Sequence, residues 1–122
     1  MEFEELYKLA CSMSKEVNIN DKSSYGQVSA VALCQNNKVY KGLSFKTTCN
    51  VGFCAETSIM AQMLLDNETR ILKLVAVHSD GEILSPCGKC REQIYQLNNQ
   101  NLECEIMLKD KIVKLKDLLP DA

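Results

Sequence analysis

The chain has 122 residues, and 46% of them are hydrophobic, a size and composition that predict one domain over residues 1–122 with a sizeable buried core. Its 14 basic and 16 acidic residues leave a net charge of −2, which argues against a protein that holds duplex nucleic acid on a basic surface. No stretch approaches the roughly 18 apolar residues that a membrane span needs.

The first third of the chain is predicted to contain one helix and two strands. Apolar residues recur at helical spacing over residues 2–16, which is typical of an amphipathic helix. The polar run 18–24 ends that helix. Residues 28–34 and 38–45 are rich in β-forming residues. Between them, residues 35–37 read Gln-Asn-Asn and favour a hairpin turn, because asparagine tolerates positive φ.

The middle of the chain is predicted to contain a loop, a helix and a strand. Residues 42–52 are expected to form a loop or an irregular strand end. From Cys54, an apolar pattern predicts a mostly buried helix that ends near Asp66. The continuous apolar run 71–78 is typical of a strand in a sheet that is covered on both faces. Residues 79–81 read Ser-Asp-Gly and predict a turn.

The last third is predicted to contain a helix and two strands. The helix follows residues 85–88, and the strands cover residues 104–108 and 112–114. Residues 115–119 are expected to form a short terminal turn or helix. Helices that lie between strands connect them by crossovers, so the order α-β-β-α-β-α-β-β predicts an α/β layered fold with a mixed sheet.

Seven cysteines and a single histidine limit the chemistry that the chain can perform. The acidic start MEFEELYKLA does not match an export signal, so we expect a cytoplasmic protein with reduced thiols. Metal ligation or catalysis is then the expected special use of cysteine. We interpret His78 as a core or sheet-end residue. Cys11, Cys34 and Cys104 fall on apolar stripes and are interpreted as core residues.

Three other cysteines are placed where predicted helices begin. Cys54 opens one helix, and Cys87 and Cys90 open the next at Cys-x-x-Cys spacing, which directs both sulfurs at one centre. The positive ends of two helix dipoles offset the negative charge of three thiolates on Zn²⁺. One coordination position stays open, as in catalytic zinc sites, and Glu56 is placed to move a water proton. We therefore predict one zinc ion per chain with these three ligands and Glu56 as the catalytic residue.

Two other interpretations of the cysteines stay open on this evidence. Cys49 and Cys54, taken with Cys87 and Cys90, have the pattern of a closed four-cysteine structural site. A Cys-x-x-Cys pair is also typical of redox proteins. The combination of Cys-Ala-Glu and Pro-Cys-x-x-Cys at two helix starts favours the catalytic zinc site.

Residues 54–56 (Cys-Ala-Glu) and 85–91 (Ser-Pro-Cys-Gly-Lys-Cys-Arg) resemble segments of the small zinc-dependent cytidine deaminases and of their relative, blasticidin-S deaminase. The resemblance extends over nearly the whole chain. It implies a three-layer fold with a mixed five-stranded sheet between helices, a homotetramer and a role in pyrimidine salvage. It also implies that the backbone at Ala55 and around Ser85 holds the edge of the pyrimidine.

The sequence departs from that family where the sugar is expected to bind. Ordinary cytidine deaminases carry a Gly-x-Asn-x-Glu-Asn pattern whose Asn and Glu bind the ribose, and this chain has Ser44 and Lys46 at those two positions. Ser44 can still form a hydrogen bond, whereas Lys46 either meets an anionic group or is a surface lysine. The arginine that usually follows Cys-Ala-Glu is Thr57 here. Arg91 either replaces it in steadying the thiolates or is an ordinary exposed helix residue.

These features predict an enzyme that hydrolyses the C4 amine of the cytosine ring in a free nucleoside, such as cytidine or deoxycytidine, and releases ammonia. One alternative is a blasticidin-S-type deaminase that acts on a modified cytosine nucleoside. Another is a non-catalytic, zinc-stabilised module that binds a nucleoside. The expected partner is a small nucleoside rather than a membrane or a nucleic acid. In the expected homotetramer, residues 45–53 of one chain lie near the active site of another.

Overall fold

The strands form one mixed β-sheet in the computed structural model, which describes residues 1–122. Five strands have three or more residues, and their order across the sheet is β3 (Val39–Thr47), β2 (Ser23–Cys34), β4 (Ile71–His78), β6 (Glu105–Met107) and β7 (Ile112–Lys114). The two-residue strands β1 (Val17–Asn18) and β5 (Ile83–Leu84) pair with β2 and β4. Only β4 and β6 run parallel, because a helical crossover connects them. The predicted mixed sheet is confirmed.

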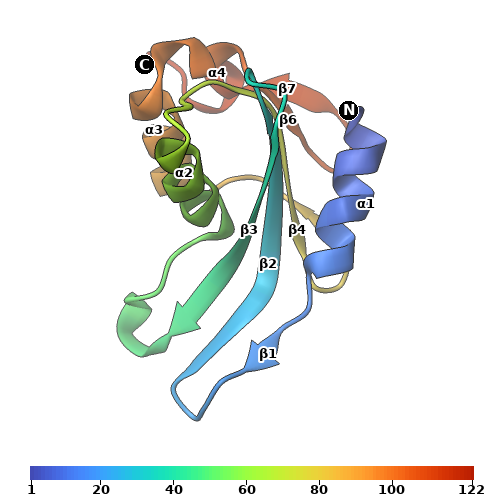
Figure 1. The fold of residues 1–122 in the computed structure, drawn as a ribbon, viewed down its shortest axis with the longest axis vertical. Coiled ribbons are helices and arrows are strands. Elements are labelled where there is room, and N and C mark those ends of the chain that lie inside the picture. Colours follow the sequence, from blue (N-terminus) through green and yellow to red (C-terminus); the bar gives the residue numbers. More distant parts are fainter.

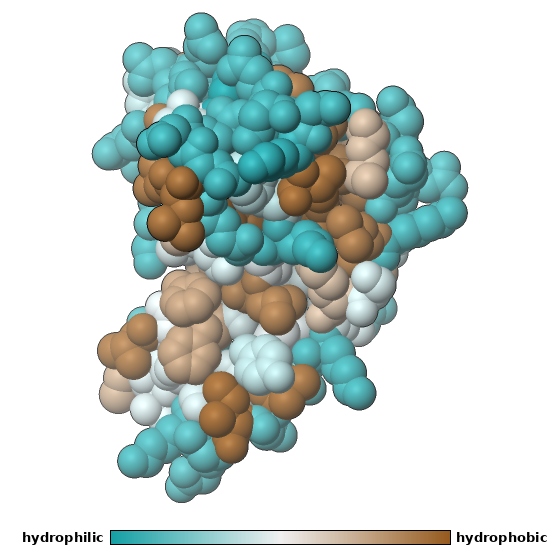
Figure 2. All heavy atoms as spheres, in the orientation of Figure 1, coloured by the Kyte–Doolittle hydropathy of each residue, from teal (hydrophilic) through white to brown (hydrophobic).

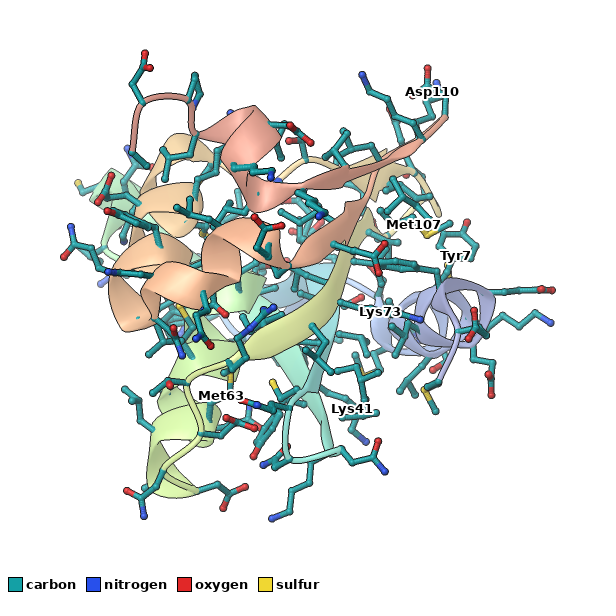
Figure 3. The ribbon with its side chains drawn as sticks, turned by 90° about the horizontal axis from the view of Figure 1, so that it is seen from above. Tyr7, Lys41, Met63, Lys73, Met107 and Asp110 are labelled. Carbon is teal, nitrogen blue, oxygen red and sulfur yellow. The ribbon has the colours of Figure 1, made fainter.

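Helices cover both faces of this sheet. The helix α1 (Phe3–Met13) lies on one face, and α2 (Ala55–Leu65), α3 (Gly88–Leu97) and the short α4 (Leu115–Leu118) lie on the other (Figures 1 and 3). Two 3₁₀ turns, η1 (Thr48–Asn50) and η2 (Asn99–Glu103), join these elements. The predicted three-layer α/β arrangement is therefore confirmed. None of the helices is long and apolar enough to cross a membrane.

Successive side chains of each strand point to opposite faces of the sheet, so the molecule has two separate hydrophobic cores, one on each face. On β2, Val31 and Leu33 pack against α1, whereas Ala30 and Ala32 pack against the helices of the other face. The α1 core is completed by apolar residues of that helix, and the larger core contains the fully buried Met63 of α2. Met63 therefore lies on the opposite side of the sheet from Tyr7 of α1, as Figure 3 shows.

The first helix is shorter than predicted, since it ends at Met13 and not at residue 16. The hydroxyl of Ser14 donates to the backbone carbonyl of Val77, 3.2 Å away, so that the chain leaves the helix toward the sheet. Residues 17–18 then pair with the beginning of β2. The periodic pattern allowed the helix to continue to residue 16, but the contacts of Ser14 and of residues 17–18 with the sheet end it earlier.

The strand β2 begins at Ser23, five residues before the predicted start at residue 28. Its first residues are polar and belong to the run 18–24, which the sequence indicated only as the end of the first helix. The side chain of Asn20 accepts hydrogen bonds from the backbone N–H groups of Lys22 and Ser23, which closes a turn before the strand. Residues 42–52, predicted as a loop or an irregular strand end, begin as the end of β3, which continues to Thr47 before η1 begins.

Candidate metal centre and active site

Three cysteine sulfurs converge where two helices begin. Cys54 is the N-cap residue of α2, Cys87 is the N-cap residue of α3, and Cys90 lies in the first turn of α3. The three Sγ atoms all lie within 4.8 Å of one another, and the Sγ atoms of Cys54 and Cys87 are 3.9 Å apart. The structure therefore places the three predicted zinc ligands together.

This donor set fits a zinc ion. Two sulfurs on a tetrahedral zinc, with bonds of about 2.3 Å, lie about 3.8 Å apart, close to the separation of Cys54 and Cys87. Burial is the main cause that raises the pKa of the Cys54 and Cys90 thiols. A divalent cation offsets that cost, because it stabilises the thiolate forms that ligate it. The positive ends of α2 and α3 point at the same place and add to the effect.

A glycine on β3 lets the first of these helices approach the sheet. A Cβ atom on Gly42 would lie 2.3 Å from the carbonyl oxygen of Ala55 and 2.9 Å from Cγ1 of Ile59. Real Cβ atoms do not approach other atoms so closely, so this strand position needs glycine. The contact holds the start of α2, with Cys54 and Glu56, against the sheet.

Glu56 lies in the first turn of α2 and is almost completely buried, with 6% of its surface exposed. Burial raises the pKa of its carboxyl group. Its charge is also the second cause, after burial, that raises the pKa of the Cys90 thiol. A buried carboxyl group with a raised pKa, close to the cysteine cluster, is suited to general acid–base catalysis.

A cavity of about 470 Å³ opens beside the cysteines. Its wall includes residues that the sequence suggested and others that it did not. The suggested ones are Ser44, Lys46, Cys54, Ala55, Glu56, Ser85 and Cys87. Thr47, Phe53 and Lys89 also line the cavity, and the sequence assigned none of them a role of its own, although they lie within the segments 45–53 and 85–91. The volume suits a small molecule of nucleoside size.

Ser44 and the two aromatic residues near it shape one wall of the cavity. The hydroxyl of Ser44 accepts a hydrogen bond from the backbone N–H of Val28, at 3.0 Å. The backbones of Phe45 and Phe53 pair with each other, and their ring centroids are 5.6 Å apart. This pairing folds the segment after β3 back over the cavity.

Arg91 binds oxygen atoms around the start of α3. Its guanidinium donates to the carbonyls of Pro86 and Leu118, at 2.8 and 3.0 Å, and to the hydroxyl of Ser85, at 3.1 Å. It therefore connects the loop that carries Ser85 to α4. Thr57, at the position that the resemblance assigns to an arginine, donates to the side chain of Gln93, 3.0 Å away, and joins α2 to α3.

The remaining cysteines and the histidine lie apart from the cluster. Cys49 is exposed in η1, with a positive φ of 59°, and its sulfur is not part of the three-cysteine group. Cys34 and Cys104 are buried in the larger core, and Cys11 packs against the other core. His78 ends β4, as predicted, and its Nδ1 is 3.3 Å from a carboxylate oxygen of Asp80.

Comparison with known proteins agrees with this geometry. Residues 1–105 match the family model described as the cytidine and deoxycytidylate deaminase zinc-binding region. The chain belongs to this deaminase family. It is a hydrolase of the cytidine deaminase type, and its three-cysteine cluster suits the zinc ion of that family.

Individual deaminases share both sequence and fold with the chain. A cytidine deaminase of Mycobacterium tuberculosis is 29% identical over 96 residues, which are 78% of this chain and 71% of that protein. A crystal structure of cytidine deaminase from the same organism has a TM-score of 0.82 at 26% identity, covering 100% of this chain and 97% of that one. The structure from Mycobacterium leprae, at 20% identity, has the same fold with a TM-score of 0.82 and covers 99% of both chains.

Proposed function

We propose that the protein hydrolyses the C4 amine of the cytosine ring in a free nucleoside, of which cytidine and deoxycytidine are the simplest, and releases ammonia. The observation that carries this proposal is the buried Glu56 beside the cluster of Cys54, Cys87 and Cys90, at a cavity large enough for a nucleoside. Family membership supports deamination of a cytidine-type substrate.

Cys54, Cys87 and Cys90 would hold the zinc ion, which would supply a Lewis acid that makes water nucleophilic at neutral pH. The carboxylate of Glu56 takes a proton from the water that attacks C4 and delivers it to N3 of the ring. It then takes the proton of the new hydroxyl group and transfers it to the amine at C4. The C4–N bond breaks, ammonia leaves, and the ring becomes a uracil. In zinc deaminases a glutamate that is not a zinc ligand has this role.

The cavity wall offers groups that can hold the rest of the substrate. We assign the backbone of Ala55 and the segment at Ser85 to the pyrimidine edge, since both line the cavity next to the cysteines. Arg91 is then a positioning residue, because it binds the Ser85 hydroxyl and the Pro86 carbonyl. Ser44 is assigned to a sugar hydroxyl, because its own proton stays free while its oxygen accepts from Val28.

We also propose that the active protein is a homotetramer in which residues 45–53 of one chain lie near the cavity of another. Apolar side chains that one chain leaves open to solvent support it: Val51 is 76% exposed, Phe53 43% and Leu65 86%. Figure 2 shows apolar groups gathered at the lower end of this face, where Figure 1 places the end of β3.

Replacing Glu56 with glutamine tests the proposed reaction. The amide has the same shape but cannot exchange the proton, so we expect kcat for cytidine or the best substrate found to fall by roughly 10²–10⁴-fold. Zinc content, measured by atomic emission, should stay at that of the unmodified protein. Ammonia release or the change in ultraviolet absorbance of the ring measures turnover.

The matched control is Glu92→Gln, since Glu92 is an exposed glutamate on α3 that bonds only to Gln96 among the side chains. We expect this variant to keep full activity. Substantial turnover by zinc-loaded Glu56→Gln would remove Glu56 from the mechanism. No ammonia from any cytosine nucleoside, with zinc fully loaded, would replace the proposal with a protein that only binds nucleosides.

A further inference from the structure

Two lysines supply the exposed charge around the cavity. Lys46, near the end of β3, and Lys89, in the first turn of α3, both line the cavity and both are exposed. The third charged residue of the wall is Glu56, which is buried. The open part of the cavity therefore presents positive charge with no exposed carboxylate to balance it.

Neither lysine is neutralised by a neighbour. The ion pairs of the chain use its other basic groups, and no carboxylate lies within 4.0 Å of the ammonium of Lys46 or Lys89. Lys46 also borders a second, shallower hollow that contains Glu16 and Asp21, yet it forms no ion pair with either. Both ammonium groups are free to meet a charge brought by a ligand.

Hydroxyl groups beside Lys46 have unused hydrogen-bonding capacity. Thr47 is a residue of the cavity wall, and its buried Oγ1 atom is the one buried side-chain oxygen or nitrogen in the chain without a hydrogen-bond partner. Ser44, two residues from Lys46, accepts a bond from Val28 and keeps its own proton free to donate. Residues two apart on a strand lie on the same face, so Ser44 and Lys46 project together.

We infer that this end of the cavity is a subsite for an anionic group, so that the protein prefers cytosine nucleosides with a phosphate or carboxylate on the sugar over neutral ones. The inference rests on the proposed deamination and names its substrate class. An ammonium group donates hydrogen bonds and cannot accept them, so Lys46 suits an anion and not a sugar hydroxyl that needs an acceptor.

Rates on matched substrates test the subsite in the zinc-loaded protein. We expect kcat/KM for cytidine 5′-monophosphate, or for the nucleoside with a 5′-carboxylate, to exceed that for cytidine by about 10-fold or more, because charge-assisted hydrogen bonds are the strong ones. The ratio should fall as ionic strength rises from about 0.05 to about 0.5 M, since these charges are exposed. The phosphate and carboxylate substrates show which anion the subsite accepts.

Substitution of Lys46 supplies the decisive comparison. Lys46→Gln should abolish most of the preference, so that the ratio of kcat/KM for the charged nucleoside to that for cytidine falls to near one. The matched control is Lys41→Gln, because Lys41 is exposed on the same strand, is labelled in Figure 3, and does not line the cavity. We expect the control to keep the full preference.

Binding separates failure of the subsite from failure of the proposed reaction. Calorimetry with zinc-loaded Glu56→Gln, and with the unmodified protein if it has no turnover, should show tighter binding of cytidine 5′-monophosphate than of cytidine. Lys46→Gln in the same background should remove the difference. Equal binding and equal rates for charged and neutral nucleosides, or a preference that survives Lys46→Gln, would overturn the subsite. Absence of turnover with a Lys46-dependent binding preference would overturn only the reaction.

Discussion

The seven cysteines of this chain have different surroundings and therefore different chemistry. Burial raises the pKa of the Cys34 and Cys104 thiols to about 12 in each case, so both stay protonated and behave as small apolar side chains. Cys54, Cys87 and Cys90 instead meet at two helix ends. Position at a helix start, rather than the residue type, distinguishes the ligands from the core thiols.

Zinc content distinguishes the open site from a four-cysteine structural site. We expect Cys49→Ser to bind one zinc ion per chain like the unmodified protein, because the exposed Cys49 is outside the three-sulfur group. Cys87→Ser removes one of the converging sulfurs and should lose most of the metal at equal chelator concentration. Atomic emission after dialysis against a weak chelator measures both variants. Loss of zinc from Cys49→Ser would favour a closed site and exclude an open coordination position.

At the residue scale, a sequence reveals those site residues that share a short local motif. Cys54 with Glu56, and Cys87 with Cys90, stand a few positions apart at helix starts, where spacing alone predicts a common direction. That Thr47 lines the cavity could not be predicted in this way. Its unpaired hydroxyl depends on how β3 and the segment after it fold together, which no local pattern encodes.

At the scale of secondary structure, the long apolar elements are easier to predict than the short polar ones. The strand β4 was predicted with its observed bounds, Ile71–His78, because both of its faces are covered. The strands β1 and β5 have two residues each and were missed. Such short strands depend on pairing with a neighbour and carry no periodicity of their own.

The contact between α2 and β3 makes a prediction about two glycines. Gly42→Ala should destabilise the fold by about 1–3 kcal/mol, the usual cost of overpacking, because the new methyl group would overlap the carbonyl of Ala55. Gly88→Ala is the matched control, since a Cβ there has no atom within 4 Å and lies in the first turn of α3. Alanine favours helices over glycine, so this variant should be as stable as the original or up to about 1 kcal/mol more stable.

Urea unfolding of the zinc-loaded proteins measures both free energies of unfolding. The two substitutions are expected to change the free energy of unfolding in opposite directions. A general sensitivity to added methyl groups near the site would instead destabilise both variants. A Gly42→Ala protein as stable as the original would mean that α2 can shift away from β3 without loss. The inferred role of Gly42 in placing Cys54 and Glu56 would then be wrong.

At the scale of the whole molecule, the apolar surface is distributed unevenly. Met60 and Met63 on α2 are only 7% and 0% exposed and belong to the core of their own chain, so this part of the helix offers no surface to another subunit. The exposed apolar side chains of this region are Leu64 and Leu65 at the end of α2 and Val51 after η1. Helical periodicity alone cannot identify the buried side of α2, because its apolar residues are not confined to one face.

The proposed homotetramer can be tested through these residues. Light scattering of the zinc-loaded protein should give a mass of about 55 kDa, four times the chain mass of 13.7 kDa. Leu65→Lys places a charge on a side chain that is 86% exposed in one chain, so it should lower the mass only if a neighbouring subunit covers that side chain. Ile112→Lys is the control, because Ile112 is 50% exposed on β7, away from α2 and the cavity.

If residues 45–53 help to close the cavity of another chain, dissociation must cost activity as well as mass. We expect Leu65→Lys to lose activity in proportion to the fraction of dissociated chains, and to regain it at protein concentrations that restore the larger mass. This concentration dependence separates assembly from misfolding, because a misfolded chain stays inactive at every concentration. Ile112→Lys should keep both mass and activity. An active monomer at micromolar concentration would show that each cavity closes within one chain, and the exposed Val51 and Leu65 would then need another explanation.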